Sequence, residues 1–398
     1  MSDPSAVPST IDLAAGFPEQ TREDWQVLVA AVLNKGRAPD AQLDGAAAEQ
    51  ALRRHLEGGL EVDAVYLRED RTLGSPGRMP FTRGRAVRDA TAPWDVRQRH
   101  DDPDVAVTRA AVLDDLEHGV TSVWLHIGDD GLAVGDLREA LADVRLDLAP
   151  VVVSSHTHQV EAAQALLDHV GDHPSVGGNL GLDPLAAAAR LGAEPDLTPL
   201  ADLVRATATR PGWRAITVDA TVLHDAGATD VDALAAAVAT GVAYVRHLEA
   251  AGIAPAQAFD QVEFRVGATA DQFLTAAALR ALRRVWARVG EASGVPEASR
   301  GARTHAVTSL RMFTREDPWV NVLRSTLATF GASIGGADAI TVLPFDTVLG
   351  LPERLGRRLA RNTQILLADE ANVARVTDPG GGSWYLESLT DDVARAVW

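Results

Sequence analysis

The strongest constraint on the fold is a repeated alternation of short apolar runs with longer alanine-rich runs. Runs rich in valine, isoleucine and threonine are typical of buried strands, and alanine-rich runs such as "VEAAQALLDHVG" are typical of helices. The strand-like runs lie at residues 94–100, 121–128, 149–156, 175–182, 214–222, 261–268, 303–310 and 337–345. Eight strand–helix units over about 260 residues predict a (β/α)₈ TIM barrel, which belongs to the α/β class.

A doubly wound open sheet is the competing architecture. No G-x-G-x-x-G run follows a strand-like segment, and the near match "GGNLGL" lacks the required spacing. In a barrel, ligand chemistry is expected at the carboxyl ends of the strands. The polar residues expected near those ends are His100, His126, His156, His158, Arg265, His305 and Arg311.

The N-terminal residues have a different pattern from the rest of the chain. Two helical runs, "DWQVLVAAVLNKG" and "AAAEQALRRHLEGG", precede an alternating run, "LEVDAVYLRED", and then a Pro/Gly/Arg-rich segment. We expect residues 1–75 to form a helical arm that makes subunit contacts. Residues 76–398 are expected to form the barrel, with residues 355–398 as the segment that closes it.

Composition excludes several classes of site. The chain of 398 residues has no cysteine, so disulfides, thiolate metal sites and cysteine nucleophiles are excluded. Lys35 is the only lysine, and no Walker-type loop contains it. A net charge of −18 argues against nucleic-acid and anionic-membrane partners. No basic, apolar leader and no apolar run long enough to span a bilayer are evident, so we expect a cytoplasmic protein.

Three local patterns have competing interpretations. His156 and His158 lie two residues apart near a strand end, which suits a metal-dependent hydrolase or a polar loop. Paired carboxylates for glycoside chemistry are poorly supported, since Glu263 lies inside its strand. The arginines of "ALRALRRVWARVG" could bind phosphate, but a solvated or interface face is favoured.

Several longer motifs resemble the methylmalonyl-CoA mutase family. The closing stretch "LARNTQILLADEANVARVTDPGGGSWYLESLT" is similar to the family's Arg-Asn-Thr-Gln helix followed by Asp-Pro-x-Gly-Gly-Ser-x-Tyr. The runs "MPFTRG", "APWDVRQRH", "HDAGATDVDALAAAVATGVAYVR", "RALRRVWARV" and "NVLRSTLATFGASIGGADAITVLPFD" also resemble family segments. The resemblance implies a barrel whose axis accepts the pantetheine arm of a CoA thioester. It further implies a flavodoxin-like cobalamin domain, which is absent from this chain.

The resemblance fails at two positions where the family contacts its substrate. The segment "TRGRAVRDATAPW" has no tyrosine, whereas the family places one over the substrate. The family's substrate-contacting histidine corresponds to Val222, and valine cannot donate a hydrogen bond to a thioester carbonyl. His224 follows two residues later, in the loop expected after the strand. No catalytic residue is therefore assigned.

The neighbouring strands keep part of the family's polar set. His305 is retained, while the family's glutamine and glycine correspond to Val307 and Leu310. Arg265 occupies the position of a family arginine for CoA, but the accompanying serine is Gly267. Apolar residues on the axis are expected to close the barrel, and Arg265, His305 and His224 to form a vestigial or alternative substrate pocket.

This combination is most similar to the small, non-catalytic subunit of the heterodimeric bacterial mutases. The resemblance implies a structural subunit of an adenosylcobalamin-dependent enzyme that interconverts succinyl-CoA and methylmalonyl-CoA. The cofactor is expected in the holoenzyme and not on this chain, and the partner is a homologous large catalytic subunit. CoA binding by this chain is doubtful, and no metal is expected. The alternative is an active acyl-CoA mutase barrel of altered specificity that uses His224, His305 and Arg265.

Overall fold

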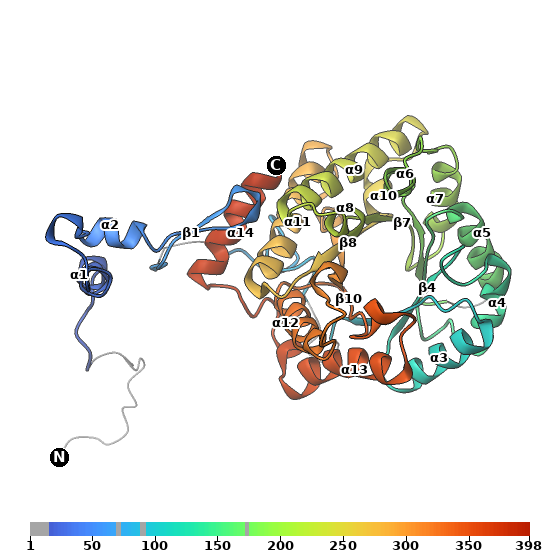
Figure 1. The fold of residues 1–398 in the computed structure, drawn as a ribbon. Coiled ribbons are helices and arrows are strands. Elements are labelled where there is room, and N and C mark those ends of the chain that lie inside the picture. The colour runs from blue at the N-terminus through green and yellow to red at the C-terminus, as the bar shows by residue number, and fades with distance from the viewer. Residues whose placement is uncertain (1–15, 69–72, 88–92, 172–174) are drawn as a thin grey trace, which may run out of the picture. The chain divides into compact units, whose positions relative to one another are not determined.

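The computed structural model describes residues 16–68, 73–87, 93–171 and 175–398. Within these ranges the chain divides into two compact units. The first contains the described residues up to Leu56 together with Glu61–Tyr66, and the second contains Glu57–Leu60 and the described residues from Leu67 to Trp398. The second unit contains the barrel (Figure 1).

The first unit begins with helix α1, Arg22–Leu33. Thr21 caps this helix by accepting a hydrogen bond from the backbone N–H of Asp24, whose carboxylate accepts one from Thr21 in return. The side chains of Val27, Leu28 and Val32 are all more than half exposed, so α1 has an uncovered apolar face within its unit. The predicted helix is therefore present.

The second expected helix of this unit is much shorter than predicted. Helix α2, Gly45–Gln50, ends before Arg54, and Arg54–His55 (β1) pairs antiparallel with Glu61–Val62 (β2). Ionic pairing explains the difference, because Arg53 contacts both Glu61 and Asp63 and so favours the hairpin. The longer strand expected from residue 60 onward is reduced to β2.

The barrel has the eight parallel strands that the sequence predicts. They close in the order β10-β3-β4-β5-β6-β7-β8-β9, and β10 pairs with both β9 and β3. The strands are β3 Asp95–His100, β4 Ser122–His126, β5 Val151–Ser154, β6 Gly178–Leu182, β7 Trp213–Asp219, β8 Val262–Ala268, β9 Arg303–Thr308 and β10 Ala339–Thr341. The doubly wound alternative is therefore wrong.

Helices surround these strands and form the outer layer (Figure 1). The helices of this unit are α3 Val105–Glu117, α4 Leu137–Ala140, α5 Gln159–Val170, α6 Pro184–Leu191, α7 Leu200–Ala208, α8 Thr221–Asp225, α9 Asp230–Ala250, α10 Pro255–Asp260, α11 Gln272–Ala292, α12 Val320–Ile334, α13 Arg354–Ile365 and α14 Trp384–Val397. The short helix α8 lies inside this layer, beside β8. A π-helical turn, η7 Leu366–Glu370, extends α13. Short 3₁₀ turns also occur, including η2 Glu57–Gly59 and η5 Leu310–Met312.

One of these helices has the length and apolar composition of a membrane span. It is α9, Asp230–Ala250, and half of its most apolar stretch of residues is buried inside the barrel unit. Burial of this kind is typical of the core helix of a barrel. No such run was expected from the sequence, because alanine and valine are interrupted there by glycine, tyrosine and charged residues.

The glycine-rich run "DPGGGS" is a structural turn that leads into α14. Asp378 and Gly382 have positive φ angles of 53° and 86°, and Ser383 caps the helix by accepting a hydrogen bond from the backbone of Leu386. Asp378 is buried and pairs with Arg280 of α11 and with Arg83, and Arg280 also pairs with Glu387 of α14. The turn thus attaches α14 to α11.

Two of the α11 arginines do not lie on the solvated or interface face that the sequence suggested, although Arg288 of the same helix is exposed. Arg280 and Arg283 are both fully buried. Arg283 donates hydrogen bonds to the backbone carbonyls of Phe81, Thr82 and Gly335. The expectation was wrong because the chain before the barrel and the segment after it both cross α11 and supply acceptors that helical periodicity cannot reveal.

Candidate functional site

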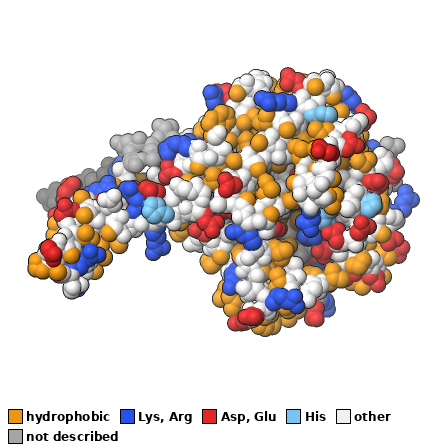
Figure 2. All heavy atoms as spheres, turned by 45° about the horizontal axis from the view of Figure 1, so that its top comes forward, with side chains coloured by type: hydrophobic (Ala, Val, Ile, Leu, Met, Phe, Trp, Pro, Cys, Tyr) orange, Lys and Arg blue, Asp and Glu red, His pale blue; other side chains and the backbone are white. Residues whose placement is uncertain are grey.

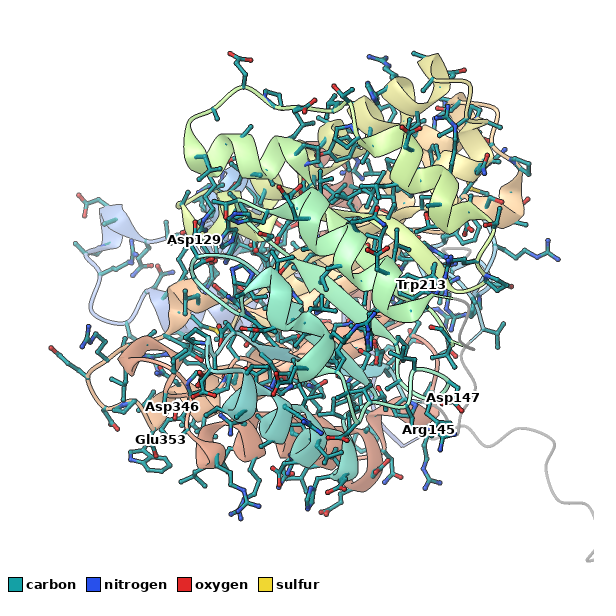
Figure 3. The ribbon with its side chains drawn as sticks, turned by 90° about the vertical axis from the view of Figure 1, so that its right-hand side faces the viewer. Asp129, Arg145, Asp147, Trp213, Asp346 and Glu353 are labelled. Carbon is teal, nitrogen blue, oxygen red and sulfur yellow. The ribbon has the colours of Figure 1, made fainter. Side chains whose placement is uncertain are left out.

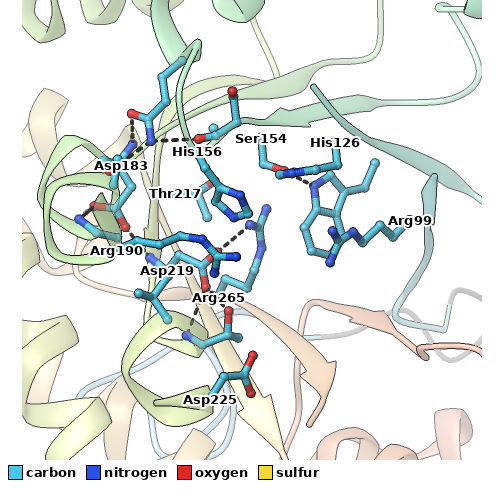
Figure 4. Close-up of a pocket in the computed structure, with 18 of the residues that line it drawn as sticks. Arg99, His126, Ser154, His156, Asp183, Arg190, Thr217, Asp219, Asp225 and Arg265 are labelled. Atoms are coloured by element: carbon cyan, nitrogen blue, oxygen red, sulfur yellow. Dashed lines mark hydrogen bonds and ion pairs between the residues drawn. The ribbon is translucent and has the colours of Figure 1, made fainter. Parts of the chain in front are cut away.

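A cavity of about 200 Å³ lies at the carboxyl ends of the strands. Figure 3 shows both ends of the barrel from the side. Asp129, Asp346 and Glu353 lie at the carboxyl ends of the strands, and Arg145 and Asp147 lie at the amino ends. The cavity is shown in Figure 4. Its polar lining residues are Arg99, His126, Asp130, Ser154, Ser155, His156, Gln159, Asp183, Arg190, Thr217, Asp219, Thr221, Asp225 and Arg265.

The floor of the cavity is the indole of Trp124, which projects into the barrel from β4. The guanidinium of Arg265 lies 4.0 Å from its ring centroid, and that of Arg99 lies at 5.2 Å. The ring of His305 meets the same indole edge-on at 5.4 Å. Trp124 donates its N–H to Ser154 at 2.7 Å, which fixes the orientation of the ring. The axis of the barrel is therefore occupied by side chains at this level.

An apolar cluster surrounds the indole and fills one side of the axis. Its buried members are Trp124, Val152, Val307, Phe313 and Leu343. This agrees with the expectation that Val307 would help to fill the barrel. Leu310 does not do so, because it lies on η5 with 41 % of its surface exposed. The expectation for Leu310 was wrong because β9 ends at Thr308, two residues earlier than predicted.

Arg265 is the central charged residue of the site. It lies on β8, donates to Asp219 of β7 at 2.8 Å and contacts the Nδ1 atom of His305 at 3.3 Å. His305 in turn contacts Thr341 of β10 through Nε2 at 2.8 Å. Burial first, and then the nearby arginines, hold the pKa of His305 well below its ordinary value. His305 is thus a neutral residue beneath the cavity floor.

A chain of hydrogen bonds runs along the rim from Trp124 to His156. Ser154 accepts from Trp124 and so can donate to His126 Nδ1, 3.0 Å away. His126 Nε2 then donates to Asp130 at 2.9 Å, and His156 Nδ1 contacts the other oxygen of Asp130 at 2.8 Å. Within the described ranges, His156 Nε2 takes no part in this network. Burial, assisted by Arg99, lowers the pKa of His126 to about 3.

His126, Asp130 and His156 also have the composition of a metal centre. Their potential ligand atoms lie within 4.8 Å of one another. The pair expected from the sequence was His156 with His158, but His158 contacts Thr157 instead. Burial first, and then the positive charge of Arg190 and Arg99, lowers the pKa of His156, and the same charge would repel a divalent cation. The prediction that the chain holds no metal stays a prediction.

His224 and Val222 lie on the short helix α8, and not on the strand or loop that the sequence suggested. The helix begins early because Asp219 accepts hydrogen bonds from the N–H and hydroxyl of Thr221. Val222 lines the cavity. His224 is buried away from it, with Nε2 at 2.8 Å from Ser309 and Nδ1 at 3.3 Å from Asp230.

The structure therefore brings together only part of the expected set. His126, His156 and Arg265 line the cavity, and His305 lies directly below it. His100 faces outward, 3.6 Å from Asp115 of α3. Arg311 donates to two backbone carbonyls, those of His224 and Ala228.

Sequence reasoning missed many of the lining residues, and Trp124, Ser154 and Thr217 are three of them. All three lie in predicted strands, and the alternation of side chains along a strand could have placed them inside the barrel.

Comparison with known proteins agrees with this architecture. Residues 126–398 match the family model described as "Methylmalonyl-CoA mutase". The closed barrel and this family match together define the class of protein. The chain belongs to the methylmalonyl-CoA mutase family.

The similar curated proteins have names more specific than the family. The chain is 50% identical over 400 residues to "Methylmalonyl-CoA mutase small subunit" from Propionibacterium freudenreichii subsp. shermanii, covering 98% of this chain and 63% of that protein. It is also 50% identical over 399 residues to the protein of the same name from Streptomyces virginiae, covering 98% and 64%. A "Probable methylmalonyl-CoA mutase small subunit" from Mycobacterium tuberculosis is 40% identical, with 98% and 65% covered.

The chain thus spans slightly less than two thirds of the length of these relatives.

Proposed function

We propose that this chain is the arm and barrel of the small subunit of a methylmalonyl-CoA mutase, with a structural and non-catalytic role. The observation that carries the proposal is that side chains occupy the axis of the barrel. Trp124, flanked by Arg99 and Arg265, lies where an open family barrel would admit the pantetheine arm of a CoA thioester. The names of the similar small subunits support the same assignment.

The residues of the cavity also suit this role. The family's substrate histidine corresponds to Val222, which lines the cavity without a polar atom on its side chain. A cavity of about 200 Å³ is smaller than the roughly 300–1,000 Å³ typical of small-molecule sites, and a CoA thioester is larger than most such ligands. The rearrangement of succinyl-CoA and methylmalonyl-CoA is therefore assigned to a homologous large subunit.

The residues of this chain do not fit adenosylcobalamin. The sequence has no Asp-x-His-x-x-Gly run to supply the histidine that would ligate cobalt. Two histidines at the carboxyl end of the barrel have both ring nitrogens engaged: His126 contacts Ser154 and Asp130, and His224 contacts Ser309 and Asp230. We propose that the cofactor of the holoenzyme is held outside this chain.

The partner and the location are parts of the same proposal. The large subunit is expected to contact the N-terminal arm, where α1 has an uncovered apolar face. We place the complex in the cytoplasm, because the CoA thioesters that the large subunit converts would be met there. Nucleic acid and membranes are not expected partners for a chain with a net charge of −18.

The alternative, an active acyl-CoA mutase using His224, His305 and Arg265, receives less support from the geometry. Only Arg265 of the three lines the cavity. His305 lies beneath Trp124, and His224 is directed toward Ser309.

Reconstitution tests the proposal. The chain, extended to the full length of its relatives, is assayed with adenosylcobalamin and methylmalonyl-CoA, alone and with the large subunit. We expect a one-to-one complex and turnover only in the mixture. Turnover by this subunit alone would overturn the non-catalytic assignment. Failure of the two subunits to associate would overturn the assignment of the partner.

A further inference from the structure

Three buried polar groups around the cavity have no hydrogen-bond partner among the residues that the structure describes. They are Arg99 Nε, Thr217 Oγ1 and Arg265 Nη2, and all three residues line the same cavity. The two arginine atoms can only donate, and the threonine hydroxyl can donate as well. Buried polar groups are nearly always paired, so three such groups around one cavity indicate a ligand that supplies acceptors.

Arg265 is positioned to hold such a ligand. Its side chain is 2 % exposed, and Asp219 occupies Nη1 while His305 faces Nε. The remaining nitrogen, Nη2, has no partner within the described part of the chain and belongs to a rigid guanidinium that Trp124 supports from one side. An arginine fixed in this way is pre-organised to bind an oxyanion.

Three of the four carboxylates of the lining, those of Asp130, Asp183 and Asp219, already accept hydrogen bonds. Both oxygens of Asp183 accept hydrogen bonds, from Tyr244 and from the backbone of Asp219 and Ala186. Asp219 accepts from Arg265 and Thr221. Burial raises the pKa of Asp183 to about 6, and burial also raises that of Asp225. The negative charge near the cavity is therefore reduced or paired.

Further donors lie at the mouth of the cavity. Figure 4 shows Arg190 extending from α6 toward Asp219 and Arg265, with His156 beside them. His156 Nδ1 is held by Asp130, so Nε2 remains for a ligand. Guanidinium groups thus approach the same space from β3, α6 and β8.

We propose that this cavity binds a small free oxyanion, either an organic carboxylate or inorganic phosphate. Its volume of about 200 Å³ corresponds to about six or seven water molecules, which fits a compact acid. Arg265 and Thr217 hold the oxyanion at the floor, and Arg190 neutralises it at the mouth. The site gives the barrel a ligand of its own, independent of CoA and of the rearrangement.

Calorimetric titration of the 398-residue chain tests the proposal. The probes are acetate, malonate and inorganic phosphate, with acetamide as the uncharged counterpart of acetate and chloride as an ionic-strength control. We expect saturable one-to-one binding of at least one oxyanion and none of acetamide or chloride. Tighter binding of acetate or malonate would identify a carboxylate site, and tighter binding of phosphate would identify a phosphate site. No saturable binding of any oxyanion would mean that water fills the cavity, and would overturn the proposal.

Variants test whether these side chains bind the oxyanion. Thr217→Val preserves shape and removes one hydroxyl, so we expect about fivefold weaker binding. Arg265→Gln removes a charged donor, so we expect a loss of at least about tenfold. Arg395→Gln is the control, because Arg395 is 71 % exposed on α14 and pairs with Asp392.

Arg190→Gln tests whether the arginine at the mouth of the cavity contributes to oxyanion binding. It also keeps the proposal testable if Arg265→Gln does not fold. We expect it to weaken binding as well. Unchanged affinity in both Thr217→Val and Arg190→Gln would place the anion elsewhere and overturn the proposal. The measurement needs neither the partner subunit nor CoA turnover, so its failure is distinguishable from failure of the proposed function.

Discussion

The guanidinium of Arg265 lies 4.0 Å from the centre of the Trp124 indole, across the interior of the barrel. Arg265 projects from β8 and Trp124 from β4, so the contact joins strands that lie opposite each other in the closed barrel. A cation over an aromatic face is attractive, and more so when both groups are out of water. This contact closes the axis, and it also fixes the arginine that faces the cavity.

Truncation of the indole should cost much of the stability of the barrel. Trp124→Ala removes the centre of a buried cluster, for which about 3–5 kcal/mol is expected. The free energy of unfolding is measured by denaturant titration. Trp319→Ala is the control, because Trp319 is 57 % exposed, and its cost should be well below that of Trp124→Ala. Equal costs would show that the axis is not tightly packed.

The arginine that joins α11 to α14 should also be critical for stability. Arg280→Ala removes the buried cation between the carboxylates of Asp378 and Glu387, of which Asp378 keeps only Arg83, and about 3–5 kcal/mol is expected. On the same helix, Arg288→Ala breaks an exposed pair with Glu291 and should cost less than about 1 kcal/mol. Comparison of the urea midpoints of the two variants checks the prediction. Similar midpoints would contradict it.

Acid should destabilise the protein partly through His126. Its pKa is about 3 in the folded barrel against an ordinary value of 6.5, so the unfolded chain binds a proton that the folded chain does not. The stability held above about pH 6.5 is lost progressively as the pH falls toward 3. Between pH 6.5 and pH 5 this residue should account for about 2 kcal/mol.

The contribution of His126 is measured as a difference between variants. The unfolding free energy of His126→Asn should fall less steeply between pH 7.5 and pH 5 than that of the unmodified protein. His118→Asn, at an exposed position, serves as the control and should leave the slope unchanged. Identical slopes for His126→Asn and the unmodified protein would contradict the assignment. Asp115 and Asp183, whose pKa values burial raises to about 6, act in the opposite direction in all of these proteins and cancel in the comparison.

The arm should contribute to pairing with the large subunit. Leu28 and Val32 are 63 % and 60 % exposed on α1, and burying such side chains favours association. The double variant Leu28→Ser, Val32→Ser should weaken the complex by about tenfold or more, measured by sedimentation of the mixed subunits. Leu148→Ser, at a position 69 % exposed on the barrel unit, should leave it unchanged. An unaltered complex in the double variant would exclude α1 from the interface.

Much of the barrel was predictable because its signal is local. Eight strands were expected and eight are present, since β-branched runs and alanine-rich runs differ in periodicity over a few residues. Their ends were less predictable. The strand expected over 214–222 stops at Asp219, because hydrogen bonds from Thr221 to that carboxylate start a helix.

The site was predicted less completely because it depends on which strands lie opposite each other. Arg265 was expected from its position in a family motif, but its contact with Trp124 joins residues that are 141 positions apart in the sequence. Arg280 and Arg283 were expected at a solvated or interface surface and are buried. Their acceptors come from both ends of the barrel unit, and no periodicity within α11 encodes that.

The pairing of Asp378 with Arg280 has a consequence for how such chains are recognised. The glycine-rich run that contains Asp378 connects two outer helices, α11 and α14, and none of its residues lines the cavity. A barrel can therefore keep this run under selection for folding while its axis diverges. Relatives recognised by this run share the ion pairs that hold α14 against α11. The residue at the position of Trp124 should instead distinguish catalytic members of the family from structural members.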